Sequence, residues 1–361
     1  MNNSSSSSGD SPSCSSESSG SNAVGVTRSE PTATRRRHLA ITAGVGLIAT
    51  TGGCLFIDSD ESIAESGTPG QTARIPDDSE TVDDLPLFDA HTHVVPTKAR
   101  GRDPLSADEL VDRMDDHGVD RAVVLAFDSP ESYPVQAPSW WVLEETDAYP
   151  DRLVPFCTID PRTLIYGTDT ADELLERYVE RGARGFGELK VGMAVDDERL
   201  ETLYERCADY ELPILFHTDR QMMTDEVGLP RLENVLASYP EVDFVAHAHG
   251  WWAHISADVE PEDRGRLPEG SIESPGRVSE LLAEYDNIYG DVSTLAGWNA
   301  LTRDEAYGQA FLESHHDQLV FGSDYLFPGQ DVPQFDLFER FELELDAWAN
   351  VRYRNLEGLL R

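Results

Sequence analysis

The segment LFDAHTH, residues 87–93, places two histidines, His91 and His93, at the end of an apolar run. Successive side chains of a β-strand point to opposite faces, so residues two apart point the same way. We therefore expect a strand that directs both imidazoles at one spot. Asp89 shares that predicted face and is expected to orient His91 by accepting its hydrogen bond. The histidines are either one edge of a site or two ordinary polar residues at a strand end.

The chain beyond residue 85 repeats this pattern, because short apolar runs alternate with amphipathic helical stretches. Eight runs are predicted as strands, at residues 87–94, 121–127, 153–159, 184–191, 213–219, 242–250, 287–294 and 318–326. Strict β–α alternation with near-continuous apolar strands predicts a parallel sheet. Eight such units in about 280 residues fit a (β/α)8 TIM barrel, an α/β fold. An open doubly wound sheet is the alternative, and the lack of G-x-G-x-x-G after the first strand weakens it.

The composition is strongly acidic. Across 361 residues, 68 acidic and 28 basic residues give a net charge of −40, and Lys98 and Lys190 are the only lysines. The acids are spread along the whole chain, which is typical of a halophilic protein kept hydrated by acidic groups at high salt. A partner-binding acidic face is the less favoured interpretation. The charge argues against nucleic acid as a partner, because phosphate binding requires clustered basic residues.

The first eighty residues are not expected to belong to the fold. Residues 1–34 are rich in Ser, Gly, Asn and Thr and are predicted to be disordered. Residues 35–54 contain RRRHL, a short apolar run and TGGC, which resemble a Tat export signal ending in a lipobox with Cys54 as the lipidated residue. An uncleaved N-terminal anchor is the alternative. Residues 55–84 form a predicted acidic linker, and residues 85–361 the barrel domain, tethered to the outer face of the cell membrane.

Unusual polar residues fall at the ends of the predicted strands. Besides the first histidine pair they are Glu188 and Lys190 on the fourth strand, His217 on the fifth, His247 and His249 on the sixth, and Asp324 on the eighth. In a TIM barrel the carboxyl ends of the strands meet at one face, where active sites lie. Burying such groups without partners is costly, so a bound divalent metal is the simplest compensation.

The residue types indicate which metal and which chemistry. Imidazoles and a carboxylate suit Zn²⁺, Mn²⁺ or Fe²⁺ rather than Ca²⁺, and Zn²⁺ is favoured. His91, His93 and His217 would supply nitrogens and Asp324 an oxygen, leaving a position for water whose pKa the metal lowers. Asp324 could also accept the proton of that water. His247 could polarise a carbonyl or protonate a leaving group, so Asp324 and His247 are the predicted catalytic residues.

Together, FDAHTH, the histidine ending the fifth strand, VAHAHG and FGSDYLFPG resemble the amidohydrolase superfamily. More closely they resemble its amidohydrolase-related (amidohydrolase 2) branch of metal-dependent barrel hydrolases and decarboxylases, over residues 87–361. The resemblance implies metal ligation by His91, His93, His217 and Asp324, with His247 as the sixth-strand histidine. It also implies one or two ions and a small-molecule substrate.

Two pairs of neighbours leave the ligand set open. His247 and His249 share a predicted face, and the family pattern of a histidine three residues before a glycine favours His247. Glu188 and Lys190 also share a face. In binuclear members a fourth-strand carboxylated lysine or glutamate bridges two metals, and GFGELK is similar to the segment of TatD-like deoxyribonucleases whose glutamate is a ligand. Glu188 is therefore the favoured possible ligand, with an ion pair between Glu188 and Lys190 as the alternative.

Two predicted βα loops are unusually long and carry tryptophan pairs. Residues 128–141 include Trp140 and Trp141, and residues 250–277 include Trp251 and Trp252. Long loops over a barrel mouth are commonly lids or pocket walls, so Trp251 and Trp252 are predicted to bind substrate. The first pair is equally compatible with the start of a helix. Arg220 could bind a substrate carboxylate or form a surface ion pair.

The favoured function is a metal-dependent hydrolase that activates water for attack on an amide, ester or lactone carbonyl. The alternative is a metal-dependent non-oxidative decarboxylase of an aromatic or unsaturated carboxylic acid. A TatD-like phosphodiesterase is favoured by Glu188 and disfavoured by the charge and the predicted export. A non-catalytic surface lipoprotein is the fourth hypothesis, and the complete ligand set counts against it. The sequence predicts no oligomeric state.

Overall fold

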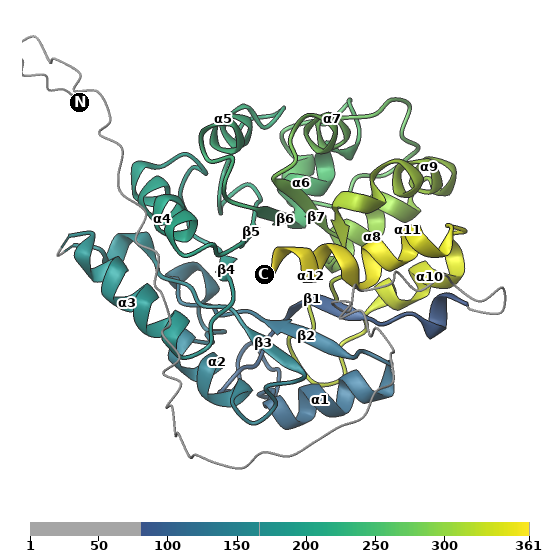
Figure 1. Cartoon of the computed structure of the whole chain (residues 1–361). Coiled ribbons are helices and arrows are strands. Elements are labelled where there is room, and N and C mark those ends of the chain that lie inside the picture. The colour runs from purple at the N-terminus through teal and green to yellow at the C-terminus, as the bar shows by residue number, and fades with distance from the viewer. Residues whose placement is uncertain (1–80, 166, 361) are drawn as a thin grey trace, which may run out of the picture. The chain divides into compact units, whose positions relative to one another are not determined.

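A computed structural model describes residues 81–165 and 167–360 (Figure 1). The strands are β1 Phe88–Thr92, β2 Arg121–Val124, β3 Leu153–Pro155, β4 Phe186–Leu189, β5 Ile214–His217, β6 Phe244–His247, β7 Ile288–Asp291 and β8 Leu319–Val320. The α-helices are α1 Ala107–Asp116, α2 Ser139–Thr146, α3 Asp169–Glu180, α4 Glu198–Asp209, α5 Pro230–Ser238, α6 Ala248–Trp252, α7 Arg277–Glu284, α8 Thr294–Thr302, α9 Glu305–His315, α10 Leu337–Arg340, α11 Leu345–Ala349 and α12 Asn355–Leu359. Short 3₁₀ turns include η1 Val82–Asp84, η2 Pro130–Ser132, η4 Ala253–Ile255 and η5 Asp263–Gly265, and η8 Asn350–Arg354 is a π-helix.

The strands confirm the predicted barrel. β1, β2 and β3 pair in that order, β4 to β8 pair in sequence order, and every pair is parallel. Parallel bridges from Thr92 to Tyr325 and from Cys157 to Phe186 join the two sheets. Helices surround the strands in Figure 1. The chain is therefore an α/β TIM barrel, as eight β–α repeats predicted.

The core has an inner and an outer part. Phe88, Val123 and Leu215 belong to an inner cluster of strand residues, to which α12 adds Leu356 and Leu359. The larger outer cluster joins the strands to the helices. A parallel sheet must be covered on both faces, which explains why its strands read as continuous apolar runs.

Local sequence explains where the helices begin. In α1, the Ser106 hydroxyl accepts from the Glu109 N–H while the Glu109 carboxylate accepts from the Ser106 N–H, which forms a capping box. Leu110, Val111 and Met114 form the buried side of this helix. The acidic positions of α1 face outward, so the acidic composition is compatible with an apolar core.

Two strands contain an irregularity that changes which face a residue occupies. In β1 the register with β2 shifts between Asp89 and Thr92, and in β4 the register with β5 shifts between Phe186 and Leu189. An extra residue reverses the alternation, since side chains alternate with period two. Asp89 consequently lies against α1, beside Leu110, whereas the ring of His91 turns to the site inside the barrel.

The predicted N-terminal features lie outside the described residues, apart from the end of the linker. These features are the disordered tail of residues 1–34, the Tat-type signal of residues 35–54 with Cys54, and most of the linker of residues 55–84. The described chain begins within the predicted linker, where Thr81 and Asp84 form a capping box around η1. Within residues 81–165 and 167–360, no helix has the length and apolarity needed to cross a bilayer.

Candidate metal centre

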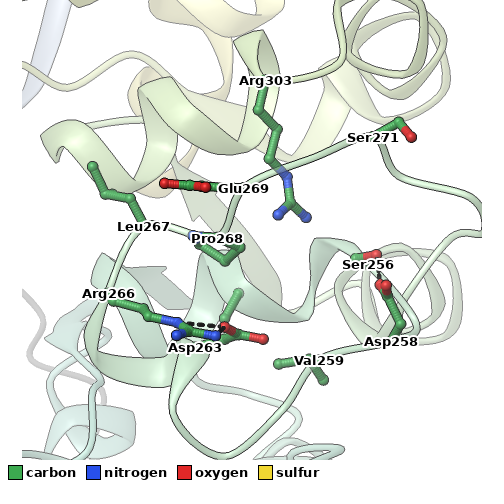
Figure 2. A pocket seen from close by; sticks show the side chains of 11 residues that line it. Ser256, Asp258, Val259, Asp263, Arg266, Leu267, Pro268, Glu269, Ser271 and Arg303 are labelled. Carbon is green, nitrogen blue, oxygen red and sulfur yellow. Dashed lines mark hydrogen bonds and ion pairs between the residues drawn. The ribbon is translucent and has the colours of Figure 1, made fainter.

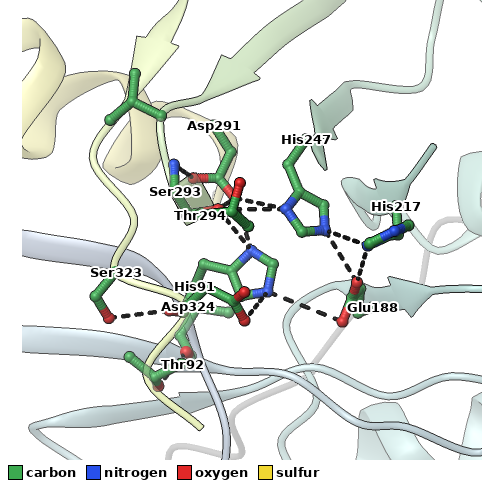
Figure 3. A network of polar contacts seen from close by, with 12 residues as sticks. His91, Thr92, Glu188, His217, His247, Asp291, Ser293, Thr294, Ser323 and Asp324 are labelled. Atoms are coloured by element: carbon green, nitrogen blue, oxygen red, sulfur yellow. Dashed lines mark hydrogen bonds and ion pairs between the residues drawn. The ribbon is translucent and has the colours of Figure 1, made fainter. Parts of the chain in front are cut away.

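The carboxyl ends of the strands bring together the side chains predicted to form a metal site (Figure 3). They are His91 and His93 of the β1 segment, Glu188 of β4, His217 of β5, His247 of β6 and Asp324 after β8. Five of these residues are at most 9% exposed, whereas the Asp324 side chain is 27% exposed. Solvent therefore reaches this cluster, called the metal cluster below, mainly beside Asp324.

The first donor set joins the β1 histidines to Asp324. The two Nε2 atoms of His91 and His93 lie 3.2 Å apart, and Asp324 Oδ1 lies 3.4 Å and 3.5 Å from them. Glu188 Oε2 lies 3.9 Å and 3.7 Å from the same two nitrogens. Ligands of a tetrahedral zinc ion, at about 2.0–2.1 Å from the metal, are about 3.3–3.4 Å from one another. The observed separations are close to that value.

The second donor set uses the other oxygen of Glu188. Glu188 Oε1 lies 3.0 Å from His217 Nδ1 and 2.9 Å from His247 Nε2, and those two nitrogens are 3.1 Å apart. The sequence had suggested a single set in which His217 joins the β1 histidines. In the structure His217 instead groups with His247 and Glu188. The two sets share the Glu188 carboxylate.

The charges of the metal cluster fit a cation. Glu188 Oε2 is buried and has no hydrogen-bond partner, although it faces the β1 histidines. Burial by itself would lower the pKa of His91, but the carboxylates of Asp324 and Asp291 outweigh it and raise the pKa to about 9. The surroundings thus stabilise positive charge at this point. Nitrogen donors with carboxylate oxygens suit Zn²⁺, Mn²⁺ or Fe²⁺.

Each histidine of the metal cluster is held by a hydrogen bond from its outward ring nitrogen. Nδ1 of His91 lies 2.7 Å from Asp291 Oδ2, and Nδ1 of His93 lies 3.1 Å from the Leu125 carbonyl. Nε2 of His217 lies 3.1 Å from Asp219 Oδ2. Nδ1 of His247 lies 3.3 Å from the Ser293 hydroxyl. Such bonds fix the tautomer, so the other nitrogen presents its lone pair to the interior of the metal cluster.

Asp291 is a site residue that sequence reasoning missed. It ends β7, is 0% exposed, and also accepts from the Ser293 hydroxyl at 2.7 Å. The prediction that Asp89 orients the His91 ring is wrong, because Asp89 accepts instead from the backbone N–H groups of His91 and Ser323. The available signal was an aspartate within the seventh predicted strand, residues 287–294.

The structure separates the two ambiguous pairs. β6 ends at His247, and Ala248, with a left-handed φ of 74°, begins α6. His249 is therefore not on the strand, and no hydrogen bond or ion pair of the described chain joins it to the metal cluster. Lys190 Nζ lies 3.3 Å from Glu188 Oε1. Glu188 therefore points into the metal cluster and also forms the ion pair with Lys190 that was the alternative interpretation.

The predicted substrate-binding residues lie elsewhere. Trp251 and Trp252 are 0% and 2% exposed in the core, which contradicts their prediction as walls of an open pocket. Trp252 Nε1 donates to the Asp291 carbonyl and so supports the strand end that orients His91. Trp140 belongs to α2, the helical alternative, and is 54% exposed. Arg220 is exposed and its aliphatic chain lies against Gly265.

Cavities open in several of the segments that follow the strands, among them those after β1, β3 and β6. One of about 340 Å³ lies in the segment after β6 and is mostly polar, with Arg303, Asp258 and Glu269 among its walls (Figure 2). The long segment of residues 250–277 therefore folds around its own cavity. Another, of about 310 Å³, is lined by the segments that follow β1, β2 and β8, and none of its lining residues belongs to the metal cluster.

A closed parallel barrel with histidines and carboxylates converging at its carboxyl ends is the architecture of metal-dependent barrel enzymes. The family model described as amidohydrolase matches residues 88–355. The chain therefore belongs to the amidohydrolase family, whose members are metal-dependent hydrolases or decarboxylases acting on small molecules.

Solved structures with the same fold are distant in sequence. An uncharacterised TIM-barrel protein of Bordetella bronchiseptica is 18% identical at a TM-score of 0.54, covering 76% of this chain and 98% of its own. A Pseudomonas putida protein named provisionally as a 2-pyrone-4,6-dicarboxylic acid hydrolase is 16% identical at 0.52, covering 76% and 97%. A 5-carboxyvanillate decarboxylase of Novosphingobium aromaticivorans, solved with manganese, is 14% identical at 0.51, covering 77% and 97%. No curated protein matches the sequence.

Proposed function

We propose that the protein is a hydrolase that uses two divalent ions to activate water for attack on an amide, ester or lactone carbonyl. The observation that carries this proposal is the position of Glu188, which turns one carboxylate oxygen to each of two donor sets. Two-metal sites are common among hydrolases. Two donor sets therefore favour hydrolysis.

The residues that would hold the ions follow from the two donor sets. His91, His93 and Asp324 would bind one ion, His217 and His247 the other, and Glu188 both. Divalent ions held there would lower the pKa of a bound water and polarise the substrate carbonyl. The donor types suit zinc best, with manganese or iron as alternatives.

Asp324 is the residue best placed to accept the proton of the attacking water. Burial opposes its ionisation, but His91 and His93 outweigh burial and lower the pKa of its carboxyl to about 2. It is therefore ionised at neutral pH, and it is the most exposed member of the metal cluster. A substrate arriving from solvent would meet Asp324 first.

His247 has a different role from the acid predicted from sequence. Burial, assisted by His91, lowers the pKa of His247 to about 4. A neutral imidazole with so low a pKa is a poor proton donor at neutral pH but a good metal ligand. We therefore propose His247 as a ligand in the second donor set.

The test is metal content per chain, measured by mass spectrometry of the full-length protein after incubation with Zn²⁺ or Mn²⁺. The proposal expects about two ions in the parent protein. His91→Ala/His93→Ala and Glu188→Gln should each lose metal, while His249→Ala, a matched change beside the metal cluster, should keep it. One ion or none in the folded parent protein would contradict the two-ion proposal.

Product analysis separates the reaction classes. Incubation of the loaded protein in ¹⁸O-labelled water with esters, lactones, amides and aromatic acids should yield ¹⁸O-labelled carboxylic acids without carbon dioxide. Release of carbon dioxide from an aromatic acid, with no labelled product, would establish the decarboxylase alternative instead. The net charge of −40 continues to disfavour a phosphodiesterase acting on nucleic acid.

We also propose that the protein is exported by the Tat pathway and anchored to the outer face of the membrane through Cys54. The support is the RRRHL and TGGC pattern of residues 35–54. Cell fractionation should find the parent protein with membranes and Cys54→Ser in the soluble fraction. Equal membrane association of both proteins would contradict lipidation at Cys54.

A further inference from the structure

The two oxygens of the Glu188 carboxylate have different surroundings. Oε2, which faces the β1 histidines, is buried and has no hydrogen-bond partner. Oε1 lies 3.0 Å from His217 Nδ1, 2.9 Å from His247 Nε2 and 3.3 Å from Lys190 Nζ (Figure 3). The two donor sets are therefore unequal, because only the second set has a lysine at its shared oxygen.

Lys190 is committed to this carboxylate. Within residues 81–165 and 167–360, Glu188 is the only acid whose oxygen lies within 4 Å of Lys190 Nζ. The other lysine of the chain, Lys98, forms an exposed pair with Asp103 far from the donor atoms in character, since its side chain is 64% exposed. Lys190 is only 21% exposed, and Glu188 is 1% exposed. The ion pair of Lys190 is therefore poorly hydrated.

The ammonium group supplies the charge that a buried carboxylate needs. Burial would raise the pKa of Glu188, but Lys190 is the largest of the opposing influences, and with His217 and His247 it holds that pKa well below its usual range. A divalent ion bound to Oε1 would supply positive charge to the same atom. Lys190 and an ion of the second set would therefore do the same electrostatic work.

The two cations would also be too close to share the oxygen without strong repulsion. A metal-bound carboxylate oxygen lies about 2.0–2.2 Å from zinc. Since Lys190 Nζ is 3.3 Å from Glu188 Oε1, it would lie at most about 5.5 Å from such an ion. Like charges at that separation repel strongly where water is largely excluded.

Lys190 can move away from the carboxylate, whereas Glu188 is fixed between the donor sets. The lysine has a flexible four-carbon stem and reaches solvent. Its Nζ also lies 5.4 Å from the centroid of the Phe127 ring, a distance at which a cation is attracted to the ring face. Phe127 itself stacks on His93 at 4.0 Å and so is held in place. The ammonium thus has both solvent and an aromatic ring beside it when it leaves Glu188.

We propose that Lys190 is a competitor for the second ion. The set formed by His91, His93 and Asp324 fills first, and an ion enters the set of His217 and His247 only by displacing the Lys190 ammonium from Glu188 Oε1. The free concentration of divalent metal then decides whether the site holds one ion or two. This inference rests on the proposed function, because it describes how metal occupancy of the same site is regulated.

The first test is the Zn²⁺ binding curve of the metal-depleted full-length protein, measured in competition with a chelator. The parent protein should bind two ions in two separate steps. Lys190→Met keeps the stem but removes the charge, so it should tighten the second step by at least about tenfold and leave the first within about twofold. Lys190→Gln should act in the same way. Lys98→Met removes the other lysine and should change neither step.

A second test follows the lysine itself. Because the chain has only two lysines, brief treatment with acetic anhydride and peptide mass spectrometry gives the reactivity of Lys190 relative to Lys98. Lys190 should react slowly in the metal-depleted and one-ion protein and faster once two ions are bound. A relative reactivity that does not change between one and two ions would overturn the proposed displacement.

The binding curves keep this inference separate from the proposed function. If the parent protein binds one ion even at saturation, the two-ion hydrolase fails, but a second ion bound by Lys190→Met and lost in Lys190→Met/His217→Ala would still support the competition. An unchanged or weaker second step in Lys190→Met, an equal change in both steps, or one ion in both proteins would overturn it.

Discussion

Acidification should destabilise the fold through His254, a histidine of η4 outside the metal cluster. The ring is 0% exposed, its Nδ1–H donates to the Gly250 carbonyl at 2.6 Å, and its Nε2 accepts from the Gly228 N–H at 3.1 Å. The bond from Gly228 needs the neutral ring, because a proton on Nε2 would face another N–H, whereas the bond to Gly250 can form in either state. Burial is the main reason that the pKa of His254 falls to about 4, and Arg264 adds to it.

The sign and size of the effect follow from this lowered pKa. The unfolded chain binds a proton at His254 with a pKa of 6.5, but the folded chain does so only near 4. The contribution of the neutral ring is therefore complete above pH 6.5 and is lost as the pH falls through 4. At about 1.4 kcal/mol per pKa unit, the loss is roughly 3 kcal/mol, steepest near pH 5.

The assay is the free energy of unfolding by denaturant at several pH values between 7 and 4. His254→Gln removes the titrating ring, so the difference between parent and variant should shrink by roughly 3 kcal/mol over this range. Asn287→Ala is the matched control, because Asn287 is a buried side chain that donates to three carbonyls and does not titrate. A parent–variant difference for His254→Gln that stays constant with pH would refute the reasoning.

Three further predictions concern residues that support the site. Asp291→Asn should weaken metal binding by about 10- to 100-fold without unfolding the protein, measured by competition with a chelator, because the amide no longer holds His91 in one tautomer; unchanged affinity would contradict this role. Gly276→Ala should destabilise the protein by about 1–3 kcal/mol or more in denaturant unfolding, since the new Cβ would lie 2.3 Å from two carbonyl oxygens. Trp251→Phe should lower stability but leave the KM of cleaved esters unchanged, because this indole lies in the core; a raised KM would instead support the predicted contact between Trp251 and the substrate.

The sequence alone determined the architecture and most members of the metal cluster. Hydrophobic periodicity is local, so eight alternating strands and helices could be recognised without knowing how they pair. The prediction of the barrel and of the amidohydrolase family is confirmed. The polar residues near the ends of these strands could be identified from the same pattern. They were expected to meet because parallel strands bring their carboxyl ends to one face. The N-terminal export and lipidation signals remain predictions.

Only the tertiary structure decided which face each of these residues occupies and which donors act together. The extra residue in β1 places Asp89 against α1 and His91 in the site, and the left-handed Ala248 ends β6 before His249. Asp291 became a site residue because β7 lies beside β8, which neighbours β1, so its carboxylate reaches Nδ1 of His91 at 2.7 Å. These features depend on strand register, on local backbone conformation and, for Asp291 and His91, on packing between residues 200 positions apart. The sequence pattern of one strand does not contain that information, because its period of two holds only while pairing is regular.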